Sequence, residues 1–180
     1  VDFGTSTSDV EPGFVGQSAA SAIHSTTAGD ITVTSSGSFF NRGSNGSNVA
    51  LFRDFTFENS NDISTAVTLT LSGAGIAANT AYEIKFWAYE SNSGGVAHSQ
   101  TFVGSSGTTG TSGTVTYGPS NVNPTSIDDF STTGAFTSDG LGVLTIVTTD
   151  SLNGDPRVNG LQVIPEPSTA LLGGLGLHLS

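Results

Sequence analysis

The stretch AYEIKFWAYE, residues Ala81–Glu90, alternates apolar and polar side chains with a period of two. Successive side chains of an extended chain point to opposite faces, so every second residue shares a face. The face that we expect in the core holds Tyr82, Ile84, Phe86 and Ala88. Aromatic and β-branched residues are frequent in this stretch, as they are in strands. The stretch therefore predicts a β-strand with one buried face.

Seven further segments show the same alternation: Asp30–Ser35, Ala50–Glu58, Ala66–Gly73, Gln100–Gly104, Gly113–Gly118, Gly142–Thr149 and Arg157–Ile164. Gly, Asn, Ser and Asp separate these segments, and such residues favour turns between antiparallel strands. No long window keeps the apolar spacing of a helix without a Gly or a β-branched run. The sequence predicts an all-β fold with negligible helix, an antiparallel β-sandwich of jelly-roll type with about 8 to 10 strands.

The length of 180 residues is typical of a single domain. We assign residues 1–164 to the β-sandwich and residues 165–180 to a C-terminal tail. The low-complexity stretch Gly104–Gly113, GSSGTTGTSG, predicts either a long flexible hairpin tip or a disordered loop.

Uncharged hydroxyl side chains dominate the composition. Ser and Thr account for 51 residues, whereas charged residues make up only 11%, against about 25% in an average globular chain. Such a surface suits an extracellular β-protein or a spacer. The chain carries four Lys and Arg residues and a net charge of -11. It therefore has no positive patch for phosphates, which argues against binding to nucleic acid or to anionic membranes.

Cysteine and methionine are both absent. The lack of Cys excludes a disulfide framework and metal sites built from thiolates. Because a natural reading frame begins with Met and this sequence begins with Val1, we expect an exported chain from which a signal peptide has been removed.

The residue types that carry catalysis are scattered along the chain. His24, His98 and His178 lie far apart, and no Gly-x-Ser-x-Gly motif is present. Asp128 and Asp129 are adjacent, but neighbouring side chains of a strand or loop point apart, whereas a glycosidase pair usually comes from two elements. We expect a protein that is not an enzyme.

One loop contains side chains suited to calcium. In DSLNGDP, residues 150–156, Asp150, Asn153 and Asp155 offer oxygen ligands around a Gly, and oxygen is the ligand that Ca²⁺ prefers. The alternative is a simple turn with solvated carboxylates. Calcium is the one cofactor that the sequence suggests.

The second face of the 81–90 strand is the candidate binding surface. It holds Glu83, Lys85, Trp87 and Tyr89. Aromatic rings beside hydrogen-bonding groups commonly hold sugars, because the ring stacks on C–H faces while polar neighbours contact hydroxyls. The alternative is that the outward Trp packs beneath a loop or at a subunit contact.

The C-terminal tail begins Pro165-Glu166-Pro167 and continues into a run of Leu and Gly. It resembles the PEP-CTERM sorting signal of exported bacterial proteins, which combines a Pro-Glu-Pro motif, an apolar membrane-spanning stretch and a basic cluster. The resemblance implies processing by an exosortase and export to the surface or matrix of a Gram-negative-type bacterium. Such bacteria commonly form biofilms and make exopolysaccharide.

The apolar part of the tail is short. It runs from Ala170 to Leu179 and no Lys or Arg follows, whereas a helix needs roughly 20 residues to cross a bilayer. Either the sequence stops within the tag, or its ending His178-Leu179-Ser180 is uncertainly assigned. We expect contact with a membrane only transiently, through a complete tag.

Three functions are consistent with these features. The first is a non-catalytic structural protein of the matrix or cell surface, such as the subunit of a self-assembling filament. Its copies would associate through exposed strand edges or through the tail added to a neighbour as a strand, although Gly173, Gly174 and Gly176 disfavour a robust strand. The second is a carbohydrate-binding module that uses the 81–90 strand to hold an exopolysaccharide, and the third is a polysaccharide-active enzyme.

Overall fold

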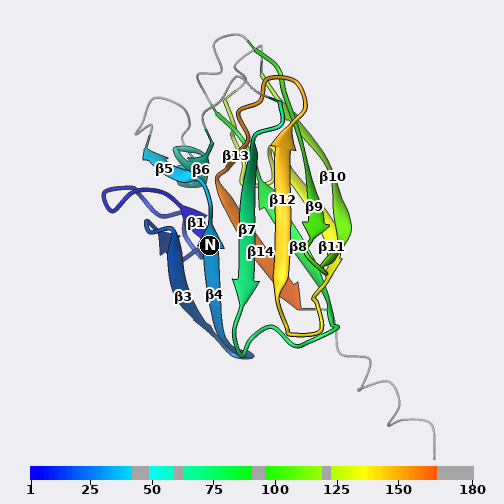
Figure 1. The fold of residues 1–180 in the computed structure, drawn as a ribbon. Coiled ribbons are helices and arrows are strands. Elements are labelled where there is room, and N and C mark those ends of the chain that lie inside the picture. Colours follow the sequence, from blue (N-terminus) through cyan, green and yellow to red (C-terminus); the bar gives the residue numbers. More distant parts are fainter. Residues whose placement is uncertain (42–48, 59–62, 91–95, 119–122, 166–180) are drawn as a thin grey trace, which may run out of the picture.

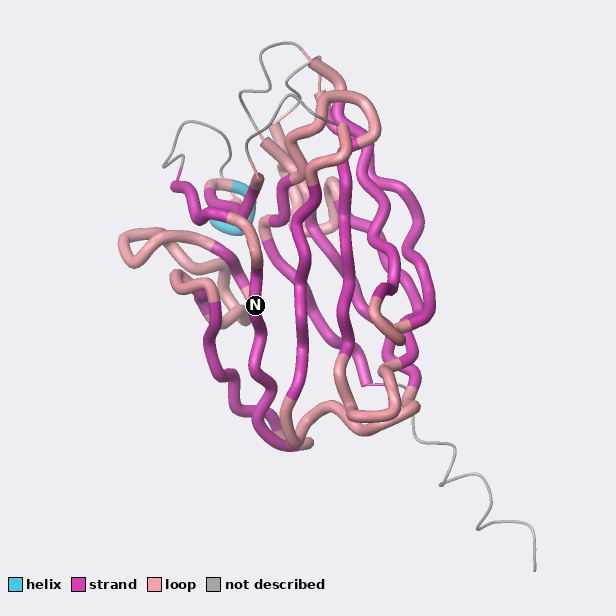
Figure 2. The backbone as a smooth tube through the Cα atoms, viewed as in Figure 1, coloured by secondary structure: helices cyan, strands magenta, loops and turns pink. Residues whose placement is uncertain are grey.

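The computed structural model describes residues 1–41, 49–58, 63–90, 96–118 and 123–165. Within these residues the regular structure consists of strands and one short 3-10 helix, with no α-helix (Figure 2). The strands are β1 (Asp2–Phe3), β2 (Gly16–Gln17), β3 (Ser21–Thr26), β4 (Gly29–Ser35), β5 (Ser38–Asn41), β6 (Asp54–Phe57), β7 (Ala66–Ser72), β8 (Ala81–Trp87), β9 (His98–Ser105), β10 (Thr109–Tyr117), β11 (Ser131–Thr137), β12 (Leu144–Asp150), β13 (Arg157–Val158) and β14 (Gly160–Pro165). The 3-10 helix η2 spans Ala50–Phe52. The all-β prediction is confirmed.

Eleven of the strands form one sheet in the order β2-β1-β14-β8-β11-β10-β9-β12-β7-β4-β3. Neighbouring strands are antiparallel except β1 and β2, which are parallel. Figure 1 shows the sheet folded over, so that β7 and β12 pass in front of β14 and β8. A smaller sheet, β13-β6-β5, lies at one end. The result is an antiparallel β-sandwich.

The core fills the space between the two layers. The ring of Phe86 in β8 stacks on that of Phe102 in β9, with centroids 4.0 Å apart, and Phe136 of β11 meets Phe86 edge-on. In β7 every second residue is buried, which places Val67, Leu69 and Leu71 inside. The period-two alternation of the sequence therefore identified the inward faces of β7 and of most of β8.

The structure contains strands that the sequence pattern did not predict: β1, β2, β3, β5 and β11. In β11 the inward positions are Thr132, Gly134 and Phe136, so only one of them is strongly apolar. Gly134 is required there because a Cβ atom at this position would lie 2.6 Å from the Cα atom of Ser112 in β10. Close approach of two backbones thus removed the apolar signal.

The stretch 104–113 is neither a long flexible tip nor a disordered loop. Most of it belongs to the hairpin of β9 and β10, which turns at Ser106 and Gly107 with φ angles of 52° and 92°. The register shifts between Thr111 and Thr114. At this irregularity the Ser112 hydroxyl accepts a hydrogen bond of 3.0 Å from the backbone N–H of Phe102. The Ser112 side chain thereby satisfies a backbone N–H group that the shifted strand pairing leaves without a carbonyl partner.

Two predicted strands are each divided between two elements. Residues 50–58 begin with η2 before β6 starts at Asp54, and residues 157–164 are divided between β13 and β14 in different sheets. Asn159 lies at the division and is fully buried. Its side-chain oxygen accepts a hydrogen bond from the backbone N–H of Tyr89 at 2.6 Å, and its amide nitrogen donates to the carbonyl of Asp54 at 2.7 Å. One side-chain amide thus connects the segment after β8 to β6.

Candidate functional site

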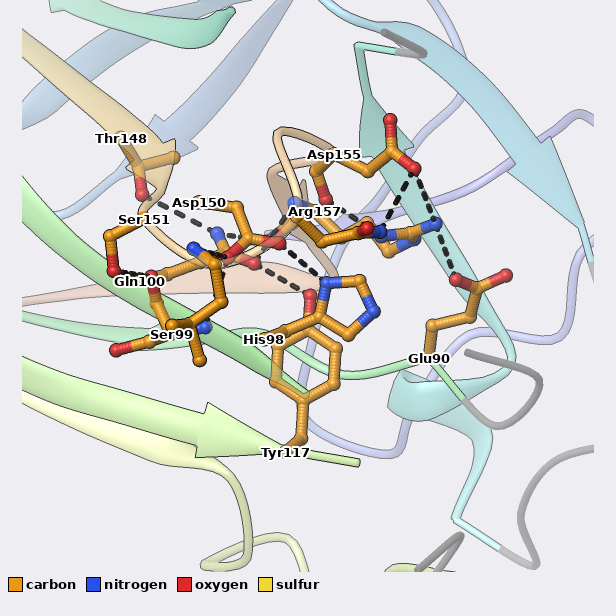
Figure 3. A network of polar contacts seen from close by, with 12 residues as sticks. Glu90, His98, Ser99, Gln100, Tyr117, Thr148, Asp150, Ser151, Asp155 and Arg157 are labelled. Carbon is orange, nitrogen blue, oxygen red and sulfur yellow. Dashed lines mark hydrogen bonds and ion pairs between the residues drawn. The ribbon is translucent and has the colours of Figure 1, made fainter. Parts of the chain in front are cut away.

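A buried cluster of polar side chains lies where β9, β10, β12 and β13 converge (Figure 3). His98 and Asp150 are fully shielded, and Nδ1 of His98 lies 2.5 Å from Oδ2 of Asp150. The second carboxylate oxygen accepts hydrogen bonds from the backbone N–H groups of Ser99 and Leu152, each at 3.0 Å. Burial acts to raise the pKa of Asp150, but these hydrogen bonds outweigh it and lower the pKa. Asp150 is therefore ionised at neutral pH.

Gln100 connects this pair to the next strand. Its amide nitrogen donates to the carbonyl of Arg157 at 2.9 Å, and its amide oxygen accepts from the Tyr117 hydroxyl at 2.7 Å. The Tyr117 ring stacks on the His98 ring with centroids 4.6 Å apart. Burial raises the pKa of Tyr117, so its hydroxyl stays protonated and remains a donor.

Arg157 links the cluster to Glu90. Nη2 of Arg157 lies 2.5 Å from a carboxylate oxygen of Glu90, which is buried, and 3.7 Å from Oδ2 of Asp155. The guanidinium also lies 5.8 Å from the centre of the Phe55 ring. Buried charges need such partners, because an uncompensated one costs several kcal/mol.

The contacts of the cluster join β9 to β10, β12 and β13. A His–Asp pair resembles the base of a nucleophilic triad, but Nε2 of His98 has no hydrogen-bond partner among the described residues and is itself buried. No Ser or Thr hydroxyl within the described part of the chain is therefore placed for activation by His98. The sequence pattern did not reveal this cluster, although polar residues at inward positions of strands, such as Gln100 and Asp150, were a signal for it.

The predicted calcium ligands have other partners. Asp150 directs its carboxylate to His98, Ser99 and Leu152. Asn153 and Asp155 do meet, but the amide nitrogen of Asn153 faces the carboxylate at 3.4 Å. Among the described residues no group of three or more His, Cys, Asp or Glu side chains is arranged to hold a metal. The loop brings Asn153 and Asp155 together, but Asp150 points to other partners. Calcium binding by the three residues therefore stays a prediction.

The predicted sugar-binding platform required Trp87 and Tyr89 to be exposed, and the structure buries both side chains. Trp87 is 2% exposed and Tyr89 is 1% exposed. The Trp87 ring is covered by Phe14 at a centroid distance of 5.2 Å, and its indole N–H donates to the carbonyl of Ile127 at 2.5 Å. The alternative, in which the Trp packs beneath a loop, describes Trp87 correctly.

Tyr89 lies beyond the end of β8, where the alternation of the strand stops. Ala88, Tyr89 and Glu90 are all buried, so the alternation of exposed and buried residues does not continue past Trp87. The Tyr89 ring stacks on Phe130 with centroids 4.7 Å apart. Period-two counting placed Tyr89 outside because it assumed that the strand continued to residue 90.

The polar members of the predicted platform remain accessible. Glu83 is exposed on β8. Lys85 pairs with Asp128 at 2.9 Å and lies 5.0 Å from the centre of the Trp87 ring. These two side chains offer no exposed ring beside which a sugar could stack.

An apolar groove borders the edge strand β3. It has a volume of about 200 Å³ and separates β3 and β4 from β14. Its apolar lining includes Val15, Ile31, Val33, Leu71, Leu161 and Val163. Within the described part of the chain β3 pairs only with β4, so its other edge is open. We call this feature the β3 groove.

Hydroxyl side chains form a row across the outer face of the layer that contains β3. Each member faces the next in the strand register: Ser105, Thr145, Thr70, Thr34 and Ser21. The row crosses five strands without a charged residue. The row itself is uncharged, although Asp30 is exposed on the same face of β4.

Comparisons of the chain with protein-family models, curated proteins and solved structures find no match. The described residues form no helix that is long and apolar enough to span a membrane. Of the predicted sorting motif, Pro165 is the last residue of β14, whereas Glu166 and Pro167 lie outside the described residues.

Proposed function

We propose that this chain is a non-catalytic structural protein of the extracellular matrix or cell surface that associates with copies of itself. The PEP-CTERM-like residues Pro165-Glu166-Pro167 support export from a Gram-negative-type bacterium, and an exosortase would process the tag. Self-association explains why a chain of this composition would keep an open strand edge.

The observation that carries the proposal is the lack of protection on β3. Natural sheets usually block an open edge with Lys, Pro or a bulge, because unpaired backbone groups recruit other strands. β3, SAIHST, contains none of these residues and pairs in continuous register with β4. Ile23 in its middle is 69% exposed. Such an edge favours pairing with another strand.

The hydroxyl row on the outer face supports the same function. Copies of a chain with a net charge of -11 repel one another in general. The row from Ser105 to Ser21 itself contains no carboxylate, so two copies can meet along it with less charge repulsion than elsewhere. The carbohydrate-binding alternative has no comparable support, because Trp87 and Tyr89 are buried.

The test is the assembly state of residues 1–180, measured by sedimentation velocity and electron microscopy. We expect oligomers or filaments for the unchanged chain and monomers for Ile23→Lys, which places a charge on the open edge. Leu141→Lys is the matched control, because Leu141 is 87% exposed and lies in the turn before β12. A monomeric unchanged chain, or equal effects of both variants, contradicts the proposal.

A further inference from the structure

β3 is the longest edge strand of the two described sheets. Figure 1 shows it at the outer side of its layer, and β4 is its only neighbour among the described strands. β3 has six residues, whereas the other edge strands, β2, β5 and β13, have two, four and two. Among the described strands, the edge that matches it in length is therefore the same edge of another copy.

The short turn after β3 fixes which residues face the open edge. Only two residues separate Thr26 from its partner Gly29, so these partners exchange backbone hydrogen bonds, and every second pair of the hairpin does the same. The residues in between direct their N–H and C=O groups away from β4. On β3 these outward residues are Ser21, Ile23 and Ser25, and all three are exposed.

We infer that β3 pairs with β3 of a second copy, antiparallel and centred on Ile23. This inference rests on the proposed self-association and names the strand that performs it. In this register Ile23 meets Ile23 of the partner subunit, and Ser21 meets Ser25 of the partner subunit. The outward backbone groups of all three residues are then paired. Moving the centre by one residue leaves those of Ser21 or Ser25 unpaired.

The outward side chains of β3 suit a pairing with themselves. Contact between two identical surfaces requires a patch that is complementary to itself about a two-fold axis. The outward sequence Ser21, Ile23, Ser25 reads the same from both ends, so it meets this requirement when the strands are antiparallel. Ile23 is 69% exposed, and contact with Ile23 of the partner subunit removes apolar surface from water on both copies.

The charges beside β3 also favour the antiparallel arrangement. β3 contains no Lys, Arg, Asp or Glu, and burial lowers the pKa of His24, so the strand is uncharged at neutral pH. The carboxylate of the hairpin belongs to Asp30, which accepts a hydrogen bond of 2.8 Å from the Ser25 hydroxyl. Antiparallel pairing places the Asp30 side chains of the two copies at opposite ends, about 13 Å apart along the strands. This separation exceeds the screening length of about 8 Å in physiological salt.

A pairing of this kind closes on itself. Both copies use the same edge, so the contact is isologous and is complete when two chains have joined. The layers that contain β3 then continue from one copy into the other as a single sheet. The inference therefore predicts a discrete dimer, and a larger assembly would need a second contact.

Introduced cysteines test the register, because the chain contains no Cys of its own. The Cβ atoms of directly paired residues lie about 4.5–5.5 Å apart, which a disulfide can bridge after a small adjustment. Under mild oxidation we expect a covalent dimer of Ile23→Cys on non-reducing gels. Leu141→Cys is the exposed control and should give only background. Ser21→Cys and Ser25→Cys should each run as a monomer alone and form a covalent dimer when mixed.

The mixture keeps Ile23 in both chains, so it tests the pairing even where Ile23→Cys weakens it. Absence of covalent dimers in the mixture overturns the inference. Covalent dimers of Ser21→Cys alone also overturn it, because they indicate parallel strands. If the unchanged chain is nevertheless oligomeric by sedimentation velocity, self-association stands and only the β3 pairing is refuted, whereas a monomeric unchanged chain contradicts both. Circular dichroism of each variant verifies that the sandwich is folded.

Discussion

Replacing Asp54 with Asn is expected to stabilise the protein at pH 8 and to leave its stability nearly unchanged below pH 4. Asp54 is 1% exposed at the start of β6, and its carboxylate oxygens have no partner in good hydrogen-bond geometry among the described residues. Burial raises its pKa from 3.8 to about 6, although the nearby Ser8 hydroxyl and Arg53 oppose the shift. The ionised form is therefore less favourable in the folded state than in the unfolded state.

The sign and size follow from this difference in pKa. Protonation of Asp54 contributes stability that is fully present below pH 3.8 and is lost as the pH rises through about 6. The difference between the two values corresponds to about 3 kcal/mol at most, and solvent near Ser8 and Asp9 reduces it to about 1–2 kcal/mol. Asn cannot ionise, so the variant recovers this free energy at pH 8.

The assay is urea unfolding of both proteins at pH 8 and pH 3.5. Glu83→Gln is the control, because it removes the same charge from an exposed position on β8. The reasoning would be refuted by a variant that is less stable than the unchanged protein at pH 8. That result would mean that the ionised carboxylate of Asp54 has a stabilising partner.

Three further changes test the buried parts of the molecule. Asp150→Asn removes the charged partner of His98 and should lower the free energy of unfolding by about 3–5 kcal/mol in urea titrations at pH 7; a loss below 1 kcal/mol would contradict the pairing. Trp87→Ala should cost about 3–5 kcal/mol in thermal unfolding, whereas an exposed Trp would leave the melting temperature almost unchanged. Gly134→Val should prevent β11 from pairing closely with β10, which a loss of amide protection in both strands would reveal, and normal protection would disprove the steric argument.

The sequence predicted the fold class because alternation is a local property. β7 and most of β8 bury the residues that their period of two selects, so Leu69 and Phe86 could be assigned to the core from the sequence. β11 could not be recognised, because Gly134 occupies an inward position for a reason that lies in β10. The stretch 104–113 was misread for a similar reason, since its ladder includes the Ser112 side chain as a hydrogen-bond acceptor.

The candidate sites depended on contacts between distant residues. His98 and Asp150 are separated by 52 positions and Tyr89 and Asn159 by 70, so the partner of each is set by strand register and sheet order. Composition by itself determined a β-protein with a weakly charged, hydroxyl-rich surface, because residue types and their spacing suffice for that. Only the tertiary structure decided that Trp87 lies beneath Phe14, that Asp150 pairs with His98, and that β3 has no second partner strand among the described residues beside an apolar groove. These features arise where segments far apart in the sequence meet, and no local pattern encodes which segments those are.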